Sequence, residues 1–165
     1  MGKADVSASR RAAVITVSDR VSRGEADDRS GPLAAELLTS AGWEVTQRRV
    51  VPDEVPLIAG AVVECCALCE VVVTTGGTGL ARRDVTPEAV RSVIDREVPG
   101  LAEAMRAATF GRLPHGMLSR QVVGARGQSL VVALPGSTGG VRDGLEVVLE
   151  VLPHAVDLLG GDSSH

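Results

Sequence analysis

The sequence predicts an α/β protein with a mainly parallel central sheet. Apolar runs alternate with helical patterns along the chain, which is typical of repeated βα units. The chain has 165 residues, 44% of them hydrophobic, so it is long enough to bury a proper core. Residues 71–75 are almost entirely β-branched, as is typical of a strand buried in the middle of a parallel sheet.

In the first half of the chain we expect three strands: residues 12–17, 43–51 and 71–75. A polar loop over residues 18–29 follows the first strand, and a helix over residues 30–40 then ends before Gly42. Asp53 is placed to cap a second helix, which runs to about Cys69 and has Pro56 in its first turn.

In the second half, Thr86-Pro87-Glu88 is a good helix start, with a cap, a proline and an acidic residue near the helix dipole. That helix is expected to end near Val98. The remaining expected elements are a helix over residues 101–109, strands over 119–125 and 129–134 around a turn at 126–128, and a helical C-terminus after the glycine-rich stretch 135–140 to about residue 159.

Composition excludes several classes of protein. The net charge is −4 and only Trp43 and Phe110 are aromatic, so a nucleic-acid partner is not expected. No apolar run approaches the ~20 residues of a membrane helix, and the N-terminus lacks a secretory signal, so we expect no membrane partner and a cytoplasmic protein. We expect a flexible leader over residues 1–11, one domain over 12–161 and a frayed tail over 162–165.

Lysine and cysteine usage narrows the chemistry further. Lys3 is the only lysine, so phosphate recognition would use backbone N–H groups, arginine or a metal rather than a P-loop lysine. Cys66 and Cys69 form a C-x-x-C pattern with Cys65 beside it, which suits redox chemistry or metal binding. We favour the simpler interpretation that these thiols pack on the inner face of a helix.

Four polar or glycine-rich segments follow expected strands: residues 18–20, 52–54, 76–84 and 135–140. Ligands of open α/β sheets bind beyond the carboxyl ends of the strands, so these segments are expected to converge on one rim. Glycines in the loop over residues 76–79 let backbone N–H groups approach an anion, and Thr75 and Thr78 add hydroxyl donors. A tight turn is the alternative, but one or two glycines would suffice for it.

Asp53 and Asp84 are the candidate metal ligands at this rim. Each has an ordinary structural explanation, Asp53 as a helix cap and Asp84 as a polar loop residue. Together, beside a glycine loop, they suit Mg²⁺, which prefers one or two carboxylates plus substrate phosphates. The sequence thus indicates a site for phosphoryl or nucleotidyl transfer.

The chain closely resembles the molybdopterin adenylyltransferases of molybdenum cofactor biosynthesis, the MoaB/Mog family. The matching motifs are residues 14–20, 51–54, 72–79, 84–89, 118–121 and 134–137. The resemblance spans nearly the whole chain. It implies a three-layer α/β/α sandwich, a homotrimer, a possible molybdenum insertase partner, and the transfer of adenylate from Mg²⁺-ATP to molybdopterin with release of pyrophosphate.

The resemblance also implies roles for individual residues. Asp53 and Asp84 would be catalytic and would hold the metal. The expected substrate-binding residues are Thr75, Gly76, Gly77, Thr78 and Gly79 for phosphate or nucleotide, and Ser119, Arg120, Pro135, Gly136 and Ser137, with Ser119 and the last three on the pterin side.

One position departs from the family pattern, because Ala133 stands where relatives often have asparagine before Leu-Pro-Gly. Alanine cannot form a side-chain hydrogen bond, so a substrate contact or loop anchor is missing there. This departure motivates a second hypothesis, a molybdopterin-binding protein with little catalytic activity. A third is another enzyme on the same domain, such as a molybdate insertase or a nucleotide-processing relative, but the insertases carry extra domains.

Overall fold

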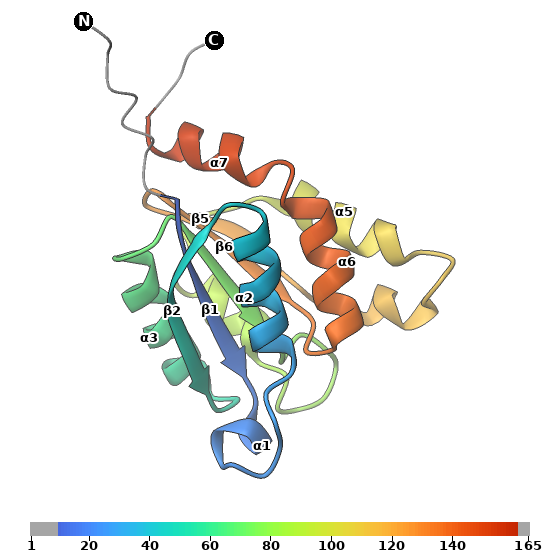
Figure 1. Ribbon diagram of the computed structural model, residues 1–165. Coiled ribbons are helices and arrows are strands. Elements are labelled where there is room, and N and C mark those ends of the chain that lie inside the picture. The colour runs from blue at the N-terminus through green and yellow to red at the C-terminus, as the bar shows by residue number, and fades with distance from the viewer. Residues whose placement is uncertain (1–9, 162–165) are drawn as a thin grey trace, which may run out of the picture.

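The structure is a computed structural model that describes residues 10–161 (Figure 1). The expected tail over residues 162–165 lies outside this range, as does the expected leader except for Arg10 and Arg11. Arg11 was wrongly placed in the leader, since it is the first residue of a strand. Its backbone N–H donates to a carboxylate oxygen of Glu70 at 2.8 Å, and its guanidinium pairs with the same carboxylate.

Six strands form one mixed sheet in the order β2-β1-β3-β6-β5-β4. The four neighbouring strands β2, β1, β3 and β6 run parallel, whereas β5 is antiparallel to both β6 and β4. The bounds are β1 Arg11–Val17, β2 Glu44–Val51, β3 Val71–Thr75, β4 Arg96–Glu97, β5 Val123–Arg126 and β6 Ser129–Leu134. The expected mainly parallel sheet, with β3 at its buried centre, is confirmed.

Helices cover both faces of the sheet and make three layers, as expected (Figure 1). One face is covered by α2 (Ser30–Ser40), α5 (Pro99–Thr109), α6 (Thr138–Val148) and α7 (Leu152–Leu159). The other is covered by α3 (Val55–Cys66) and α4 (Thr86–Arg91). Alternate side chains of β3 enter the two cores, Val71 and Val73 on the first face and Val72 on the second.

The helix α3 differs from its expected form at both ends. Its N-terminal cap position is Glu54, and no side chain caps it, so the expected cap at Asp53 is wrong. The Asp53 carboxylate instead accepts a hydrogen bond from the backbone N–H of Asp19 at 2.8 Å. At its other end α3 stops at Cys66 rather than Cys69. In the turn that follows, the N–H groups of Leu68 and Cys69 both donate to the Cys65 carbonyl.

The three thiols occupy the apolar core side of α3 and the turn after it. Cys65 and Cys69 are buried and Cys66 is half-buried. Burial raises the pKa of the Cys65 thiol, and raises that of Cys66 to about 11. Within residues 10–161 there is no group of three or more side chains suited to hold a metal. The burial of Cys65 and Cys69 agrees with the packing interpretation, and whether the three thiols react stays untested.

Other boundaries were wrong where tertiary contacts decide them. The helix that starts at Thr86 ends at Arg91, and the segment after it pairs with β5 through the N–H groups of Asp95 and Val98. This segment contains β4, which was not expected. The expected strand over residues 119–125 starts only at Val123, since Arg120 bonds to the glycine loop instead.

The structure also contains helices that were not expected as separate elements. A short helix, α1 (Asp19–Ser22), lies in the expected loop over residues 18–29, and Ser18 caps it by accepting from Val21 N–H at 3.2 Å. A 3₁₀ helix, η1 (Pro114–Leu118), follows α5. The helical C-terminus is split into α6 and α7, with a proline in the first turn of α7. None of the helices described is long and apolar enough to cross a membrane.

Candidate functional site

The four segments expected at one rim do meet there. They follow β1, β2, β3 and β6, which are adjacent and parallel, so their carboxyl ends share one edge. Two cavities open at this edge. The η1 cavity, of about 470 Å³, lies between the glycine loop, α5, η1 and the start of α6. The α1 cavity, of about 570 Å³, lies between the glycine loop, the end of β1 and the start of α2. Both are lined by Gly77, Asp84, Gly136 and Ser137.

The glycine loop adopts a backbone that other residues rarely adopt. Gly76 and Gly77 have φ values of +105° and +69°. A Cβ atom on Gly76 would lie 2.2 Å from the carbonyl oxygen of Val17. The turn itself therefore requires Gly76 and Gly77, so these two glycines alone do not indicate a ligand.

The unpaired backbone of the loop does indicate one. The N–H groups of Gly77, Thr78 and Gly79 donate to no acceptor within residues 10–161. All three residues line the η1 cavity, and Gly77 also lines the α1 cavity. Consecutive N–H groups without partners at the end of a strand form a concave site for an anion. The loop is therefore chemically suited to phosphate oxygens.

Neighbouring side chains hold the loop in this form. Thr86 donates its hydroxyl to the Gly76 carbonyl at 2.8 Å and its N–H to the Gly77 carbonyl at 3.1 Å. The guanidinium of Arg120 donates to the carbonyls of Gly79 and Asp84 at 2.9 and 2.7 Å, and it also pairs with Glu88. Arg120 lines neither cavity. Its visible role is to brace the loop, and its expected contact with substrate stays a prediction.

The two expected metal ligands lie at the α1 cavity, on loops that follow β2 and β3. Asp53 Oδ2 is bonded to the N–H of Asp19, while Oδ1 faces Gly77, where an added Cβ would approach within 3.1 Å. Asp84 Oδ2 accepts from the N–H of Ala81 at 2.9 Å. The pKa of the Asp53 carboxyl is raised above its ordinary value, mainly by burial. The charges of Asp19 and Asp84 also raise it, and the hydrogen bond from the Asp19 N–H lowers it in part.

This donor set fits Mg²⁺ together with a phosphate ligand. Two carboxylates from different loops lie beside unpaired N–H groups, and each keeps an oxygen that accepts no hydrogen bond within the part of the chain described. Mg²⁺ is commonly held by one or two carboxylates, with water and substrate phosphates completing its shell. Asp53 and Asp84 are the residues that would hold it.

The expected substrate-binding residues divide between the cavities. Those at the η1 cavity are Gly77, Thr78, Gly79, Ser119, Pro135, Gly136 and Ser137, and those at the α1 cavity are Thr75, Gly76, Gly77, Gly136 and Ser137. Two of their hydroxyls have structural partners. Thr75 donates to the Pro135 carbonyl at 2.8 Å, and Ser137 caps α6 by accepting from Gly140 N–H at 3.0 Å.

Sequence reasoning missed Gln121, which lines the η1 cavity beside Ser119. Gln121 is 5% exposed, and its Oε1 and the Oγ of Ser119 are buried without hydrogen-bond partners in residues 10–161. Arg106 holds their segment by donating to the Gln121 carbonyl at 3.1 Å. Buried polar atoms without partners are uncommon in proteins, so these two are candidates to contact a ligand. Gln121 ends the motif over residues 118–121 that resembles the family, and this match is the signal that could have suggested it.

A second buried hydroxyl without a partner among the residues described lies next to Ala133. Ala133 is the register partner of Thr74 on the neighbouring strand, and both are fully buried. Thr74 Oγ1 has no hydrogen-bond partner among the residues described. An alanine side chain offers no hydrogen bond to it, and the expected loss of a substrate contact or loop anchor at Ala133 stays a prediction.

We expect Thr74→Val to raise the free energy of unfolding by about 1 kcal/mol, because it removes a buried hydroxyl that forms no bond and keeps the side-chain shape. Urea unfolding measures the change. Thr86→Val is the matched control: its buried hydroxyl donates to the Gly76 carbonyl, so this variant should lose about 1 kcal/mol. Equal losses in both variants would show that the Thr74 hydroxyl has a partner after all.

Comparison with known sequences identifies relatives along almost the whole chain. Residues 13–154 match a family described as a probable molybdopterin binding domain. A molybdopterin adenylyltransferase of Helicobacter pylori strain J99 is 39% identical over 153 residues, which cover 90% of this chain and 87% of that protein. Gephyrin of Dictyostelium discoideum is also 39% identical, but the match covers 88% of this chain and only 22% of gephyrin.

Comparison with solved structures also identifies molybdopterin biosynthesis proteins as similar to this chain. The molybdopterin biosynthesis enzyme MoaB from Thermus thermophilus superposes with a TM-score of 0.86 and is 46% identical. The superposition covers 92% of this chain and 96% of that one. The three-layer fold expected from the sequence is therefore shared with a solved relative over nearly the full length of both chains.

Proposed function

Because this chain belongs to the family of probable molybdopterin-binding domains, we propose that it is a molybdopterin adenylyltransferase of molybdenum cofactor biosynthesis. The observation that carries the proposal is the rim between the two cavities. Three unpaired N–H groups of the glycine loop lie there beside the carboxylates of Asp53 and Asp84. A site of this kind suits the transfer of a phosphate-bearing group between two substrates.

The reaction joins the two substrates at their phosphates. The terminal phosphate of molybdopterin attacks the α-phosphorus of ATP, a new P–O bond forms, and pyrophosphate leaves. The glycine loop borders both cavities, so it can bind phosphate oxygens from either side. Ser119 and Gln121 support placing the pterin in the η1 cavity, and Asp53 supports placing the triphosphate at the α1 cavity.

The protein contributes placement and charge rather than a covalent intermediate. The unpaired N–H groups bind the phosphate that undergoes attack, while Thr86 and Arg120 keep the loop fixed. Asp53 and Asp84 would hold Mg²⁺, which when bound offsets the negative charge of the phosphates.

Pyrophosphate release tests the proposal directly. With molybdopterin, ATP and Mg²⁺, we expect stoichiometric pyrophosphate and a product heavier than molybdopterin by one adenylate, detected by mass spectrometry. Omitting molybdopterin should abolish release. Binding of molybdopterin without pyrophosphate release would favour the binding-protein hypothesis. Molybdate insertion by this chain alone would favour the insertase hypothesis.

The proposal extends to assembly and partners. The exposed apolar side chains of Phe110, Leu113, Met117 and Leu118, around the end of α5 and η1, support association of this chain with further copies of itself, and we propose the homotrimer. We also propose a molybdenum insertase partner, because similar domains occur inside longer polypeptides, among them a bifunctional molybdenum cofactor biosynthesis protein of Synechococcus elongatus. The cytoplasmic location stays a prediction.

A further inference from the structure

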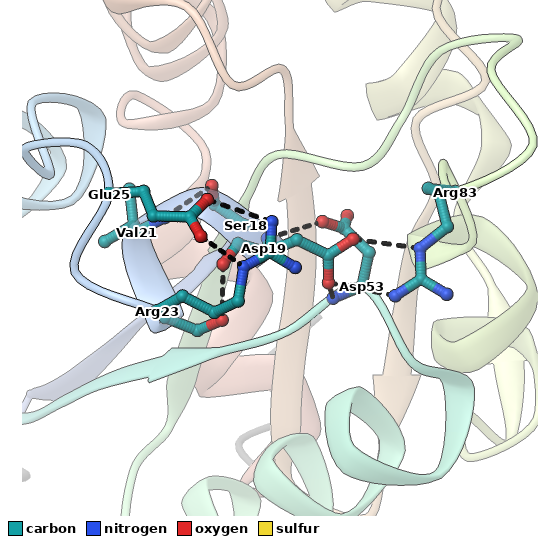
Figure 2. Close-up of polar contacts among 8 residues, drawn as sticks. Ser18, Asp19, Val21, Arg23, Glu25, Asp53 and Arg83 are labelled. Atoms are coloured by element: carbon teal, nitrogen blue, oxygen red, sulfur yellow. Dashed lines mark hydrogen bonds and ion pairs between the residues drawn. The ribbon is translucent and has the colours of Figure 1, made fainter.

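A network of hydrogen bonds joins Asp19, Asp53 and Arg83 (Figure 2). The N–H of Asp19 donates to Asp53 Oδ2 at 2.8 Å, and the N–H of Asp53 donates to Asp19 Oδ1 at 3.0 Å. The guanidinium of Arg83 donates to both oxygens of Asp19, each at 2.9 Å. Asp19 begins α1, which follows β1, and Asp53 and Arg83 lie on the loops after β2 and β3, so the network joins three segments of the rim.

Asp19 contacts one proposed metal ligand, Asp53, and the chain neighbour of the other, Arg83. The backbone N–H of Asp19 holds Oδ2 of Asp53, and the other oxygen, Oδ1, faces Gly77. The Asp19 side chain holds the Asp53 backbone by accepting from its N–H. Its ion pair with Arg83 holds the residue directly before Asp84. Two-point pairing of arginine with a carboxylate fixes orientation as well as distance. Asp19 therefore links the loop that carries Asp53 to the loop that carries Asp84.

Asp19 itself does not contact either cavity. It lines neither of them, although its side chain is only 18% exposed, whereas the Arg83 side chain is 61% exposed. A surface ion pair contributes little to stability in general, so fastening the fold is a weak explanation for this one. Residues that orient metal ligands commonly change metal affinity by ~10–100-fold when they are replaced.

We propose that Asp19, held by Arg83, is a positioning residue that sets the spacing of Asp53 and Asp84 and thereby the affinity of the rim for a divalent cation in the presence of nucleotide. This inference rests on the metal site of the proposed function and extends it to two residues that do not contact the ion.

The test measures the affinity of each variant for Mn²⁺ in the presence of a non-hydrolysable ATP analogue. Electron paramagnetic resonance monitors the binding. Asp19→Ala keeps the backbone N–H bond to Asp53 Oδ2 but removes the side-chain bonds to the Asp53 N–H and to Arg83, and it should weaken Mn²⁺ binding about tenfold. Arg83→Gln should weaken it by a smaller factor, and Arg83→Lys should recover part of the loss. The double variant should bind no more weakly than Asp19→Ala alone, because both changes break one network.

Glu25→Gln is the matched control. It breaks an ion pair with Arg23 at 3.0 Å beside the same short helix, with both side chains more than half exposed and no contact with Asp53 (Figure 2). Mn²⁺ binding should be unchanged in this variant. Thermal unfolding of every variant separates metal affinity from folding, and the exposed Arg83 keeps the test open if Asp19→Ala does not fold.

The outcomes separate this inference from the proposed function. Weaker Mn²⁺ binding in the network variants, in a protein that does not adenylylate molybdopterin, would support the inference and refute the function. Normal turnover with Mn²⁺ affinity unchanged in Asp19→Ala and Arg83→Gln would overturn the inference alone. Absence of Mn²⁺ binding by the unaltered protein with the ATP analogue would also overturn it.

Discussion

Replacing Asp84 with asparagine will lower the rate of pyrophosphate release on the order of 100- to 1000-fold, with the protein still folded. Asparagine has the same shape as aspartate, and its carbonyl oxygen can still accept the N–H bond from Ala81. The change thus removes the negative charge and leaves the loop in place. Loss of a carboxylate ligand weakens Mg²⁺ at the point where phosphate charge must be neutralised. Asp53→Asn should act in the same direction.

The control for Asp84→Asn is Asp95→Asn. Asp95 is also a loop carboxylate that accepts a backbone N–H, from Gly127 at 2.6 Å, but it is exposed where Asp84 is half-buried, lies beside β5 and lines neither rim cavity. The Asp95→Asn variant should turn over at the same rate as the unaltered protein. Steady-state turnover at saturating ATP, with Mg²⁺ varied, measures both variants. If Asp84→Asn retains full turnover at low Mg²⁺, the carboxylate does not hold the metal and its catalytic role is wrong.

The parallel core and its rim could be predicted because they depend on local patterns. The β-branched run at Val71–Thr75 must be buried on both faces, and the glycine and acidic residues that follow it must then lie at a carboxyl edge. The strand β4 carried no such pattern. It is only Arg96–Glu97, both exposed, and it exists because neighbouring N–H groups bond to β5.

The missed parts of the site depend on contacts between distant residues. Asp53 follows the local pattern of a helix cap, but the N–H of Asp19, 34 residues away, binds its carboxylate. Arg83 and Asp19 are 64 residues apart, so no spacing in the sequence links them. Gln121 lies in the matching motif over residues 118–121, but its buried oxygen without a partner in the described chain is visible only in the fold.

Replacing Gly76 with alanine will lower the free energy of unfolding by about 3 kcal/mol, from backbone strain and overpacking together. A φ of +105° is unfavourable for any residue with a side chain, and the new Cβ would lie 2.2 Å from the Val17 carbonyl oxygen. That oxygen belongs to the end of β1 and cannot rotate away. The Gly76 peptide is also held on both sides, by the Leu134 carbonyl at 3.0 Å and the Thr86 hydroxyl at 2.8 Å.

Two comparison variants identify the cause of this loss. Gly77→Ala should cost less, because its φ of +69° is a milder strain and its closest neighbour, at 2.4 Å, is the terminal oxygen of a side chain, Thr86 Oγ1. Gly60→Ala, in the exposed middle of α3 with no atom within 4 Å of the new Cβ, should instead gain about 0.5–1 kcal/mol. Urea unfolding followed by circular dichroism measures all three. Equal stability of Gly76→Ala and Gly60→Ala would mean that the loop can move away from β1. It could then not hold three N–H groups fixed toward a phosphate.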